Sequence, residues 1–303
     1  MSAPVQMGRY GQPSHLLVQI SDPHFLAAGA PLYGRVDTER AVREAIRLVE
    51  NSGLRPDAVL VTGDVADRGE ADAYRRIRAI IEPAAKRLGA ELVWVMGNHD
   101  SRGPFRRELL GAKATTEPVD AVLTINGLRI ITLDSSVPGY HHGDLSDDQL
   151  YWLGRELAAA APNGTILVLH HPPLPTSFPI LTILELQRQE RLADTIAGTD
   201  VRVILAGHLH YATAGSFAGV PVSVAAATSY TMDLAGPQRE LVGVDGGQSI
   251  SLIRVYDDQI VTSVLPLGNF EQVSGFDEAF LSRLEQLSPG ARIDAFSRFT
   301  GPE

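Results

Sequence analysis

The hydrophobic positions of the chain fall into short runs that are separated by segments with helical periodicity. Seven runs are rich in β-branched and aliphatic residues and are almost continuously apolar, as is typical of strands covered on both faces. We predict strands over residues 16–21, 57–62, 91–96, 128–133, 165–170, 201–206 and 220–225. Because these runs alternate with helical patterns, the sequence predicts an α/β protein built on layered sheets.

Four helices are predicted between these strands. The first follows Asp37, a candidate N-cap, and ends near Gly53. The second covers 70–88 and is interrupted by Pro83, since proline cannot donate a backbone hydrogen bond. The third opens with Ser146 and Gln149 at capping-box spacing, and the fourth covers 181–197 behind a proline-rich loop.

The pattern of hydrophobic and polar residues predicts three parts of the chain. Residues 1–14 are expected to be a flexible N-terminus, and 15–247 form the main domain. Residues 248–303 are expected to be a C-terminal extension that packs on the same core. Within it, 251–268 predicts a hairpin that turns at Asp257–Asp258, and 276–287 predicts a terminal helix.

The composition narrows the class of partner and of site. The chain has 303 residues, a formal net charge of −10 and no cysteine. Acidic excess disfavours nucleic acid as a partner, because that affinity depends largely on Lys and Arg contacts to phosphates. Without thiolates, any metal must have nitrogen and oxygen ligands. No apolar run reaches the roughly 18 residues of a membrane span, and no signal-peptide-like stretch is seen, so we expect a cytoplasmic protein.

Polar side chains follow five of the seven predicted strands. In an open α/β sheet, ligands bind beyond the carboxyl ends of the strands. Taken singly, each of these residues is more typical of a turn, a helix cap or a hydrogen-bonded loop histidine. Taken together and in order, they predict a binding site made from Ser21-Asp22-Pro23-His24, Gly63-Asp64-Val65-Ala66-Asp67, Gly97-Asn98-His99-Asp100, His170-His171 and Gly207-His208-Leu209-His210.

The order of these blocks resembles a known superfamily. D-x-H, G-D-x-x-D, G-N-H-D, a strand-end histidine and G-H-x-H, spread over about residues 16–230, resemble the calcineurin-like metallophosphoesterases. The segments 31–37, 134–145 and 170–175 further resemble the bacterial class III cyclic-nucleotide phosphodiesterases. The resemblance implies a four-layer αββα sandwich with a C-terminal hairpin and helix, two metal ions at the sheet edge, and a homodimer.

The resemblance also implies a role for individual residues. One metal would be held by Asp22, His24 and His210, and the other by Asn98, His170 and His208, with Asp64 between them. Asn98, His99, His24 and His210 would contact the substrate. His99 would contact the phosphate and protonate the leaving alkoxide as the catalytic acid, the alternative being that it only orients Asn98. Asp67 and Asp100 would support the histidines or cap helices, and His171 would pack behind the ligands.

The ligand chemistry agrees with this reading. Two metals about 3.5–4 Å apart can share a bridging hydroxide. In an in-line displacement at phosphorus they stabilise both the attacking and the leaving oxygen. Nitrogen and oxygen ligands suit Fe, Mn or Zn, in divalent or trivalent states. The predicted activity is hydrolysis of 3′,5′-cyclic nucleotides, cyclic AMP and also cyclic GMP, to 5′-monophosphates through such a hydroxide.

Other functions fit the same residues. A broad phosphodiesterase that prefers 2′,3′-cyclic nucleotides or glycerophosphodiesters, or a phosphomonoesterase, would use the same two metals. A non-catalytic interaction scaffold is a further alternative, although no ligand has been lost. His141 and His142 could reach the site or a dimer contact, but their loop is more typical of a solvent-exposed pair.

Overall fold

The computed structural model describes residues 5–237 and 239–299 of the chain. Residues 1–4 of the predicted N-terminal segment and 300–303 of the predicted extension lie outside this part. The chain divides into a large unit, Ser14–Leu267, and a small unit made of the residues before and after it.

The strands of the large unit form two main sheets. The five-stranded sheet has the order β13-β12-β1-β2-β3, and the six-stranded sheet has the order β4-β5-β6-β7-β9-β8. All seven predicted strands are present, and their ends differ from the prediction by at most one residue. The strands are β1 His15–Ile20, β2 Ala58–Thr62, β3 Glu91–Val95, β4 Ala121–Ile125, β5 Leu128–Leu133, β6 Thr165–Leu169, β7 Val201–Ala206, β8 Thr213–Phe217, β9 Val220–Val224, β12 Ser249–Val255 and β13 Ile260–Pro266, with a separate pair β10 Thr231–Met232 and β11 Gly243–Val244.

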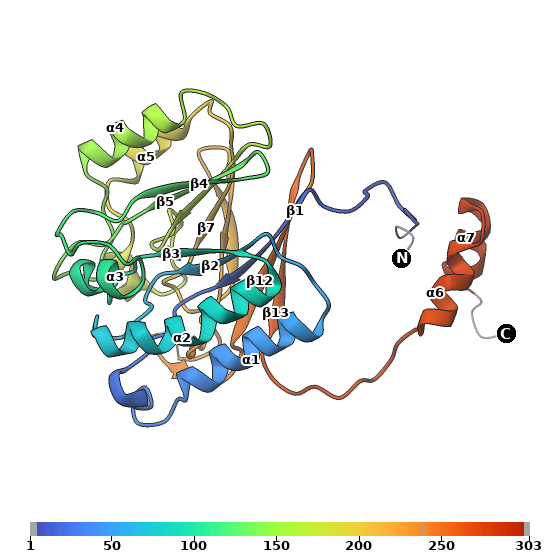
Figure 1. Cartoon of the computed structure of the whole chain (residues 1–303), viewed down its shortest axis with the longest axis horizontal. Helices are drawn as coiled ribbons and strands as arrows, with labels where there is room; N and C mark the ends of the chain where they lie inside the picture. The colour runs from blue at the N-terminus through green and yellow to red at the C-terminus, as the bar shows by residue number, and fades with distance from the viewer. Residues whose placement is uncertain (1–4, 238, 300–303) are drawn as a thin grey trace. The chain divides into compact units, whose positions relative to one another are not determined.

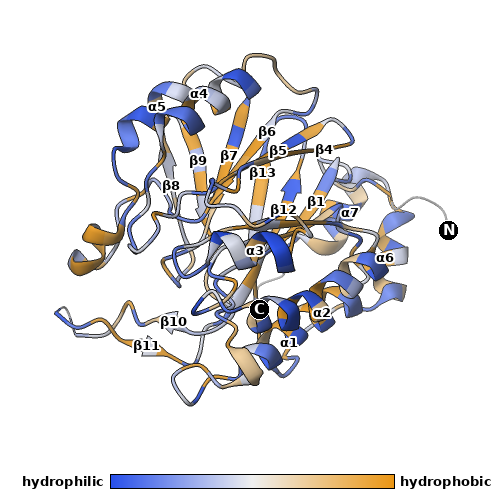
Figure 2. Cartoon of the chain, turned by 60° about the vertical axis from the view of Figure 1, so that its left-hand side comes forward, coloured by the Kyte–Doolittle hydropathy of each residue, from blue (hydrophilic) through white to orange (hydrophobic). Residues whose placement is uncertain are grey.

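The two sheets pack face to face between helices. Leu17 and Leu60 of the first sheet share one buried cluster with Ile166 and Leu205 of the second. A second cluster joins the outer face of the five-stranded sheet to α1 (Thr38–Asn51) and α2 (Ala71–Leu88), and a third joins the six-stranded sheet to α4 (Asp147–Glu156) and α5 (Gln189–Ile196). Figure 1 shows these layers, and Figure 2 shows apolar strands between helices with hydrophilic outer faces. The predicted αββα sandwich is confirmed.

The helix starts follow the sequence signals. The Asp37 side chain accepts a hydrogen bond from the Arg40 amide at the start of α1, and Ser146 and Gln149 form a capping box at the start of α4. The predicted interruption at Pro83 is wrong, since α2 is continuous through it. Pro83 lies on the exposed face of α2, and the buried face is continuous on both sides of it, so packing on the sheet outweighs the lost hydrogen bond.

The predicted helix over 181–197 is also wrong in its first half. The structure has a 3₁₀ segment, Pro179–Leu184, and then α5 from Gln189. Between them Leu186 forms a β-bridge with Gly143, and Arg188 has a φ of +50°. Since that backbone conformation cannot continue a helix, the chain must start again at Gln189.

The predicted C-terminal hairpin forms and joins the main sheet. β12 pairs with β1 in antiparallel register, and β12 pairs with β13 around the turn at Asp257–Asp258. After Gly268, the small unit contains α6 (Glu278–Glu285) and α7 (Pro289–Phe296), where one terminal helix was predicted, with Phe276, Phe280 and Phe296 in ring contact. Among the described residues, no helix is both long and apolar enough to cross a membrane.

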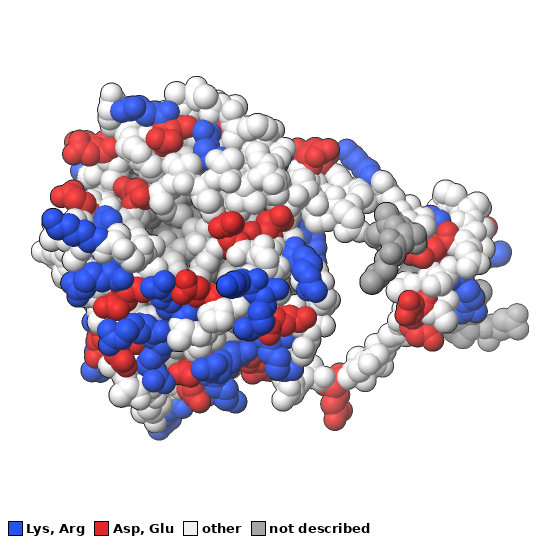
Figure 3. Space-filling model, in the orientation of Figure 1, with Lys and Arg blue, Asp and Glu red and all other residues white. Residues whose placement is uncertain are grey.

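Charged side chains of both signs are mixed on the surface. On the face shown in Figure 3, basic and acidic residues lie side by side over α1 and α2. Ion pairs such as Arg76–Glu39 and Arg87–Glu50 join the two helices. Charges of opposite sign are therefore paired across the outer surface of these two helices.

Candidate metal centre

The predicted polar residues converge where parallel strands of both sheets end. β1, β2 and β3 run parallel in one sheet, and β5, β6 and β7 run parallel in the other, so their carboxyl ends meet along one edge of the sandwich. Two groups of side chains there could each hold a metal ion, because within each group the candidate ligand atoms lie within 4.8 Å of one another. The first group is Asp22, His24, Asp64 and His210, and the second is Asp64, His170 and His208.

Asp64 belongs to both groups and lies between them. Its Oδ2 atom is 3.5 Å from Nε2 of His24 and 3.3 Å from Nε2 of His170. Its other oxygen accepts a hydrogen bond of 2.8 Å from the His99 amide. Burial opposes ionisation, but the surrounding imidazoles, His170 foremost, hold the pKa of Asp64 well below its usual value. A carboxylate held ionised between two histidine groups is suited to bridging two cations.

Hydrogen bonds behind three histidines select which ring nitrogen faces this carboxylate. Nδ1 of His170 lies 2.9 Å from the Thr62 carbonyl, and Nδ1 of His210 lies 2.9 Å from the Tyr230 carbonyl. A carbonyl can only accept, so Nδ1 carries the proton in both rings. Nδ1 of His24 is 3.1 Å from the Asp67 carboxylate. In all three, Nε2 is therefore the nitrogen turned to the centre, as in metal sites whose histidines are oriented from behind.

His208 is oriented in the opposite sense. Its Nε2 lies 3.1 Å from the carbonyl of Leu184, in the 3₁₀ segment, which leaves Nδ1 as the nitrogen without a proton. Burial lowers the pKa of His208 to about 3 and lowers the pKa of His210 well below its usual value. Both rings are thus neutral, the form in which imidazole binds a metal.

Two buried polar atoms at the centre have no hydrogen-bond partner among the described residues. They are Nε2 of His170 and Oδ1 of Asn98. The amide nitrogen of Asn98 lies 2.9 Å from Nδ1 of His141, which leaves Oδ1 as its free ligand atom. Because buried polar atoms are nearly always paired, two buried atoms without a hydrogen bond at the edge of a carboxylate–imidazole cluster fit a bound cation.

The protonation of His170 differs from that of its neighbours in the same cluster. Burial lowers its basicity, but Asp64 and Asp22 more than offset this and raise its pKa to about 10. Burial, together with the nearby charge of Asp64, raises the pKa of Asp22. Excess negative charge therefore surrounds this histidine, which a metal would neutralise in place of a proton.

The backbone is strained at the strand ends that carry these residues. Positive φ values are uncommon outside glycine and cluster at functional sites. Here they occur at Asp22 (+50°), His24 (+47°), Asp64 (+48°), His208 (+71°) and His210 (+59°). Half of the ten described non-glycine residues with positive φ are therefore predicted ligands.

The glycines in the motifs leave room for these side chains. A Cβ on Gly97 would lie 2.2 Å from Oδ1 of Asp64, and one on Gly207 would lie 2.7 Å from Oδ2 of Asp22. A Cβ on Gly63 would lie 2.2 Å from Nδ1 of His170, and this residue also has a φ of +90°. These positions need glycine because a side chain from another strand end already occupies the space of a Cβ.

The residues predicted to support the ligands have distinct surroundings. Asp67 contacts His24 through its carboxylate, and its main-chain carbonyl lies 2.8 Å from Nδ1 of His99. His171 is fully buried, with Nδ1 2.8 Å from the Ser135 hydroxyl. Asp100 accepts hydrogen bonds from three backbone amides, those of Val65, Ala66 and Gly97, and from the Tyr74 hydroxyl, rather than from a histidine. It ties the loop after β2 to the loop after β3.

His141 is exposed, as predicted, and it also borders the predicted ligands. Besides its contact with Asn98, its ring centroid lies 4.9 Å from that of His99. His141 follows no strand, and although it lies in the segment 134–145, the pattern along the chain left open whether it reaches the site. Only the return of the loop after β5 to the sheet edge places it there.

Residues 15–212 match the calcineurin-like phosphoesterase family. The chain belongs to this family. A probable cyclic nucleotide phosphodiesterase of Rhodococcus erythropolis is 53% identical over 87% of this chain and 87% of its own length. A cAMP/cGMP dual specificity phosphodiesterase of Mycobacterium tuberculosis is 50% identical over 97% of this chain and 92% of its own length.

Solved structures with low sequence identity share the fold. A dimetal phosphatase from Danio rerio matches with a TM-score of 0.61 at 14% identity, over 85% of this chain and 98% of its own. A purple acid phosphatase from yellow lupin matches with a TM-score of 0.61 at 15% identity, over 84% of this chain and 52% of its own. These likenesses extend to the architecture and agree with the two-sheet sandwich.

Proposed function

We propose that this chain is a dimetal phosphodiesterase that hydrolyses 3′,5′-cyclic AMP and 3′,5′-cyclic GMP to 5′-monophosphates. The observation that carries the proposal is the position of Asp64, whose Oδ2 is within 3.5 Å of histidines from both groups. The functions named for the relatives that are 53% and 50% identical support the substrate class.

The residues proposed to hold the metals fall into two sets. Asp22, His24 and His210 would hold one ion, Asn98, His170 and His208 the other, and Asp64 would bridge them. Fe, Mn and Zn each suit these ligands. When bound, such a pair supplies a nucleophilic oxygen at neutral pH and neutralises charge on the phosphate.

The remaining residues of the site position the substrate and move a proton. The Nδ1 atom of His99 is held by the Asp67 carbonyl, so Nε2 is the nitrogen free to reach a ligand. In the proposed reaction His99 donates a proton from Nε2 to the 3′ oxygen as the bond between this oxygen and phosphorus breaks. Asp67 would fix His24 from behind, and His141 would hold the amide of Asn98 so that its oxygen faces the metal.

Other phosphate esters remain alternatives for the same centre. A probable glycerophosphodiester phosphodiesterase of Arcobacter nitrofigilis is 31% identical over 72% of this chain. The first experiment is therefore metal analysis of the purified protein, with hydrolysis of 3′,5′-cyclic AMP, 2′,3′-cyclic AMP, glycerophosphodiesters and bis(p-nitrophenyl) phosphate in added Mn²⁺. We expect about two metals per chain, as in two-metal phosphoesterases, and preference for the 3′,5′-cyclic ester. A strong preference for another ester would change the substrate assignment but keep the dimetal mechanism. Absence of both metal and turnover would refute the proposal.

The bridging role of Asp64 has its own test. Asp64→Asn should lower both the metal affinity and the turnover. We expect each loss to exceed the roughly 10–100-fold that results when a ligand loses the hydrogen-bond partner behind it. Asp194→Asn, an exposed change on α5, is the matched control. If Asp64→Asn keeps two metals and full activity, Asp64 is not a ligand.

A homodimer and a cytoplasmic location stay predictions. Light scattering on the purified protein tests the first, and fractionation of cells that make the protein tests the second. Recovery of a monomer, or of the protein in the membrane fraction, would contradict them.

A further inference from the structure

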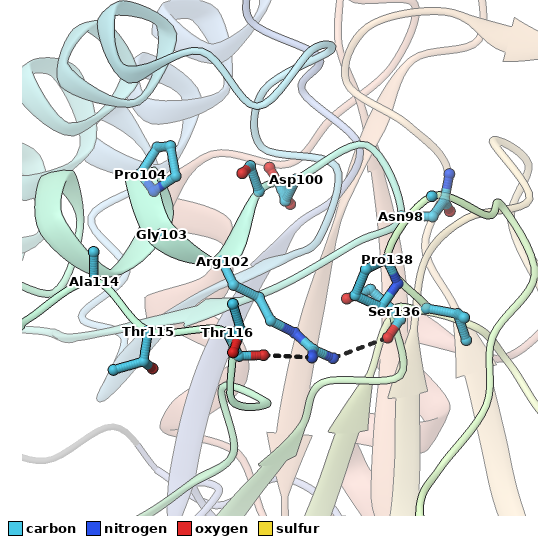
Figure 4. A pocket seen from close by; sticks show the side chains of 13 residues that line it. Asn98, Asp100, Arg102, Gly103, Pro104, Ala114, Thr115, Thr116, Ser136 and Pro138 are labelled. Carbon is cyan, nitrogen blue, oxygen red and sulfur yellow. Dashed lines mark hydrogen bonds between the residues drawn. The ribbon is translucent and has the colours of Figure 1, made fainter.

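A preformed pocket opens beside the metal centre and shares Asn98 with it. Its volume is about 540 Å³, within the usual range for small-molecule sites. Residues of three segments line it: Asn98 and 100–104 after β3, 114–116, and 136–139 after β5. Figure 4 shows Asn98 at one end of this pocket and Ala114 and Thr115 at the other.

Arg102 fixes the walls of the pocket. Its Nε donates to Asp134, and its two terminal nitrogens donate to the carbonyls of Thr116 and Ser136, which belong to two different segments that line the pocket (Figure 4). Because every nitrogen of this guanidinium is already engaged, the group offers a ligand its planar face. Guanidinium planes are surfaces on which nucleobases stack.

The electrostatics of the pocket favour an uncharged ligand group. Asp100 and Arg102 are the charged residues among those that line it, and both are held by hydrogen bonds to the protein. Pro104, Ala114 and Pro138 add apolar surface. A second phosphate would find no free cation here, whereas a nucleoside needs none.

The polar groups left over do not discriminate between purines. The hydroxyls of Thr115 and Thr116 have no hydrogen-bond partner among the described residues, and a hydroxyl both donates and accepts. Adenine presents an amino donor at the position where guanine presents a carbonyl acceptor. A threonine hydroxyl can satisfy either.

We propose that this pocket binds the nucleoside part of the cyclic nucleotide, with the base against the face of Arg102 and the threonine hydroxyls accepting both adenine and guanine. The inference rests on the proposed function and adds the subsite that recognises the nucleoside. The phosphate would lie at Asn98 and His99, at the end of the pocket nearest the predicted ligands.

The test fills the pocket without touching the metal centre. Thr115→Trp should raise KM for 3′,5′-cyclic AMP and 3′,5′-cyclic GMP about ten-fold, because the indole occupies the space of the base and excludes it from the face of Arg102, and stacking of a base is worth about 1–3 kcal/mol. The inhibition constant of 5′-AMP should rise by a similar factor, while that of inorganic phosphate, which needs only the metal centre, should not change. Metal content and circular dichroism verify that the variant is folded.

Three further variants sharpen the result. Lys113→Trp places the same bulk two residues before Thr115, outside the lining, and should have no effect. Leu241→Trp fills a different groove, lined by Tyr33 and Tyr230, and should also leave KM unchanged. Thr116→Val removes a hydroxyl at nearly constant shape and should raise KM about three-fold for both nucleotides.

The outcomes separate the two proposals. If Thr115→Trp leaves KM and 5′-AMP inhibition unchanged, or if Leu241→Trp alone raises them, the nucleoside binds elsewhere and this inference is overturned. If the metal-loaded natural protein does not hydrolyse cyclic nucleotides although phosphate inhibits its action on bis(p-nitrophenyl) phosphate, the proposed function fails, and the subsite with it.

Discussion

The Nε2 atoms of His24 and His210 lie 3.1 Å apart, and the other nitrogen of each ring already contacts the protein. Two imidazole lone pairs that face each other at this distance repel unless a cation or proton lies nearby. Burial and the rigid strand ends hold the pair in place. The fold thus supplies the energy that pre-arranges this pair of histidines for binding.

Asp67 should matter through His24. Asp67→Asn weakens the charged partner behind this histidine, so we expect metal affinity and kcat/KM to fall by roughly 10–100-fold, the usual cost of losing such a partner. Titration of the apo protein with Mn²⁺, followed by calorimetry, measures the affinity. The exposed Asp194→Asn serves as control, and equal affinities for the two variants would show that Asp67 plays no part.

His141 should act by orienting Asn98. His141→Ala removes the contact to the amide nitrogen of Asn98, and we expect a fall of roughly ten-fold in kcat/KM together with weaker binding of one metal of the two. His142→Ala, in the same loop, should change neither. Loss of activity with unchanged metal affinity would instead point to contact of His141 with the substrate.

Gly97 should tolerate no side chain. Gly97→Ala would bring a Cβ to 2.2 Å from Oδ1 of Asp64, so the carboxylate must move or the loop must open. We expect a loss of about 1–3 kcal/mol in unfolding free energy and reduced metal content. Gly246→Ala, whose Cβ would meet nothing within 4 Å, is the control. Urea denaturation of both variants would contradict this if their midpoints coincide.

Asp120 should make stability depend on pH. Burial, with a contribution from Asp134, raises the pKa of Asp120 to about 6. Between its unfolded pKa of about 4 and this value, the folded chain binds more protons than the unfolded chain, so rising pH costs stability. Above pH 6 the full loss of unfolding free energy is reached.

The Asp120→Asn variant isolates this effect. One oxygen of Asp120 accepts both of its hydrogen bonds, from the Asp134 amide and the Gln149 side chain, and an asparagine oxygen can do the same. The variant should therefore gain on the order of 2 kcal/mol over the natural protein at pH 7 and nothing at pH 4. Denaturation curves at several pH values measure the difference, and a gain that does not vary with pH would exclude Asp120 as its source.

The linear sequence determined the strands, most helix starts and the positions of the strand-end residues. Apolar runs mark the strands because burial on both faces requires them, and Asp37 marks a helix start because its side chain satisfies a free amide. The motif blocks around Asp22 and Asp64 could be found for the same reason, since each lies within a few residues of a strand that locates it.

Only the tertiary structure decided which of these residues meet, and how. Packing on the sheet keeps α2 helical at Pro83. The β-bridge at Leu186 interrupts the predicted helix, and the carbonyl of Leu184 then contacts His208. His141 and the pocket beside Arg102 arise from loops distant in sequence. Such contacts depend on how two sheets stack, a relation between far-apart segments that no local pattern of hydrophobic and polar residues encodes.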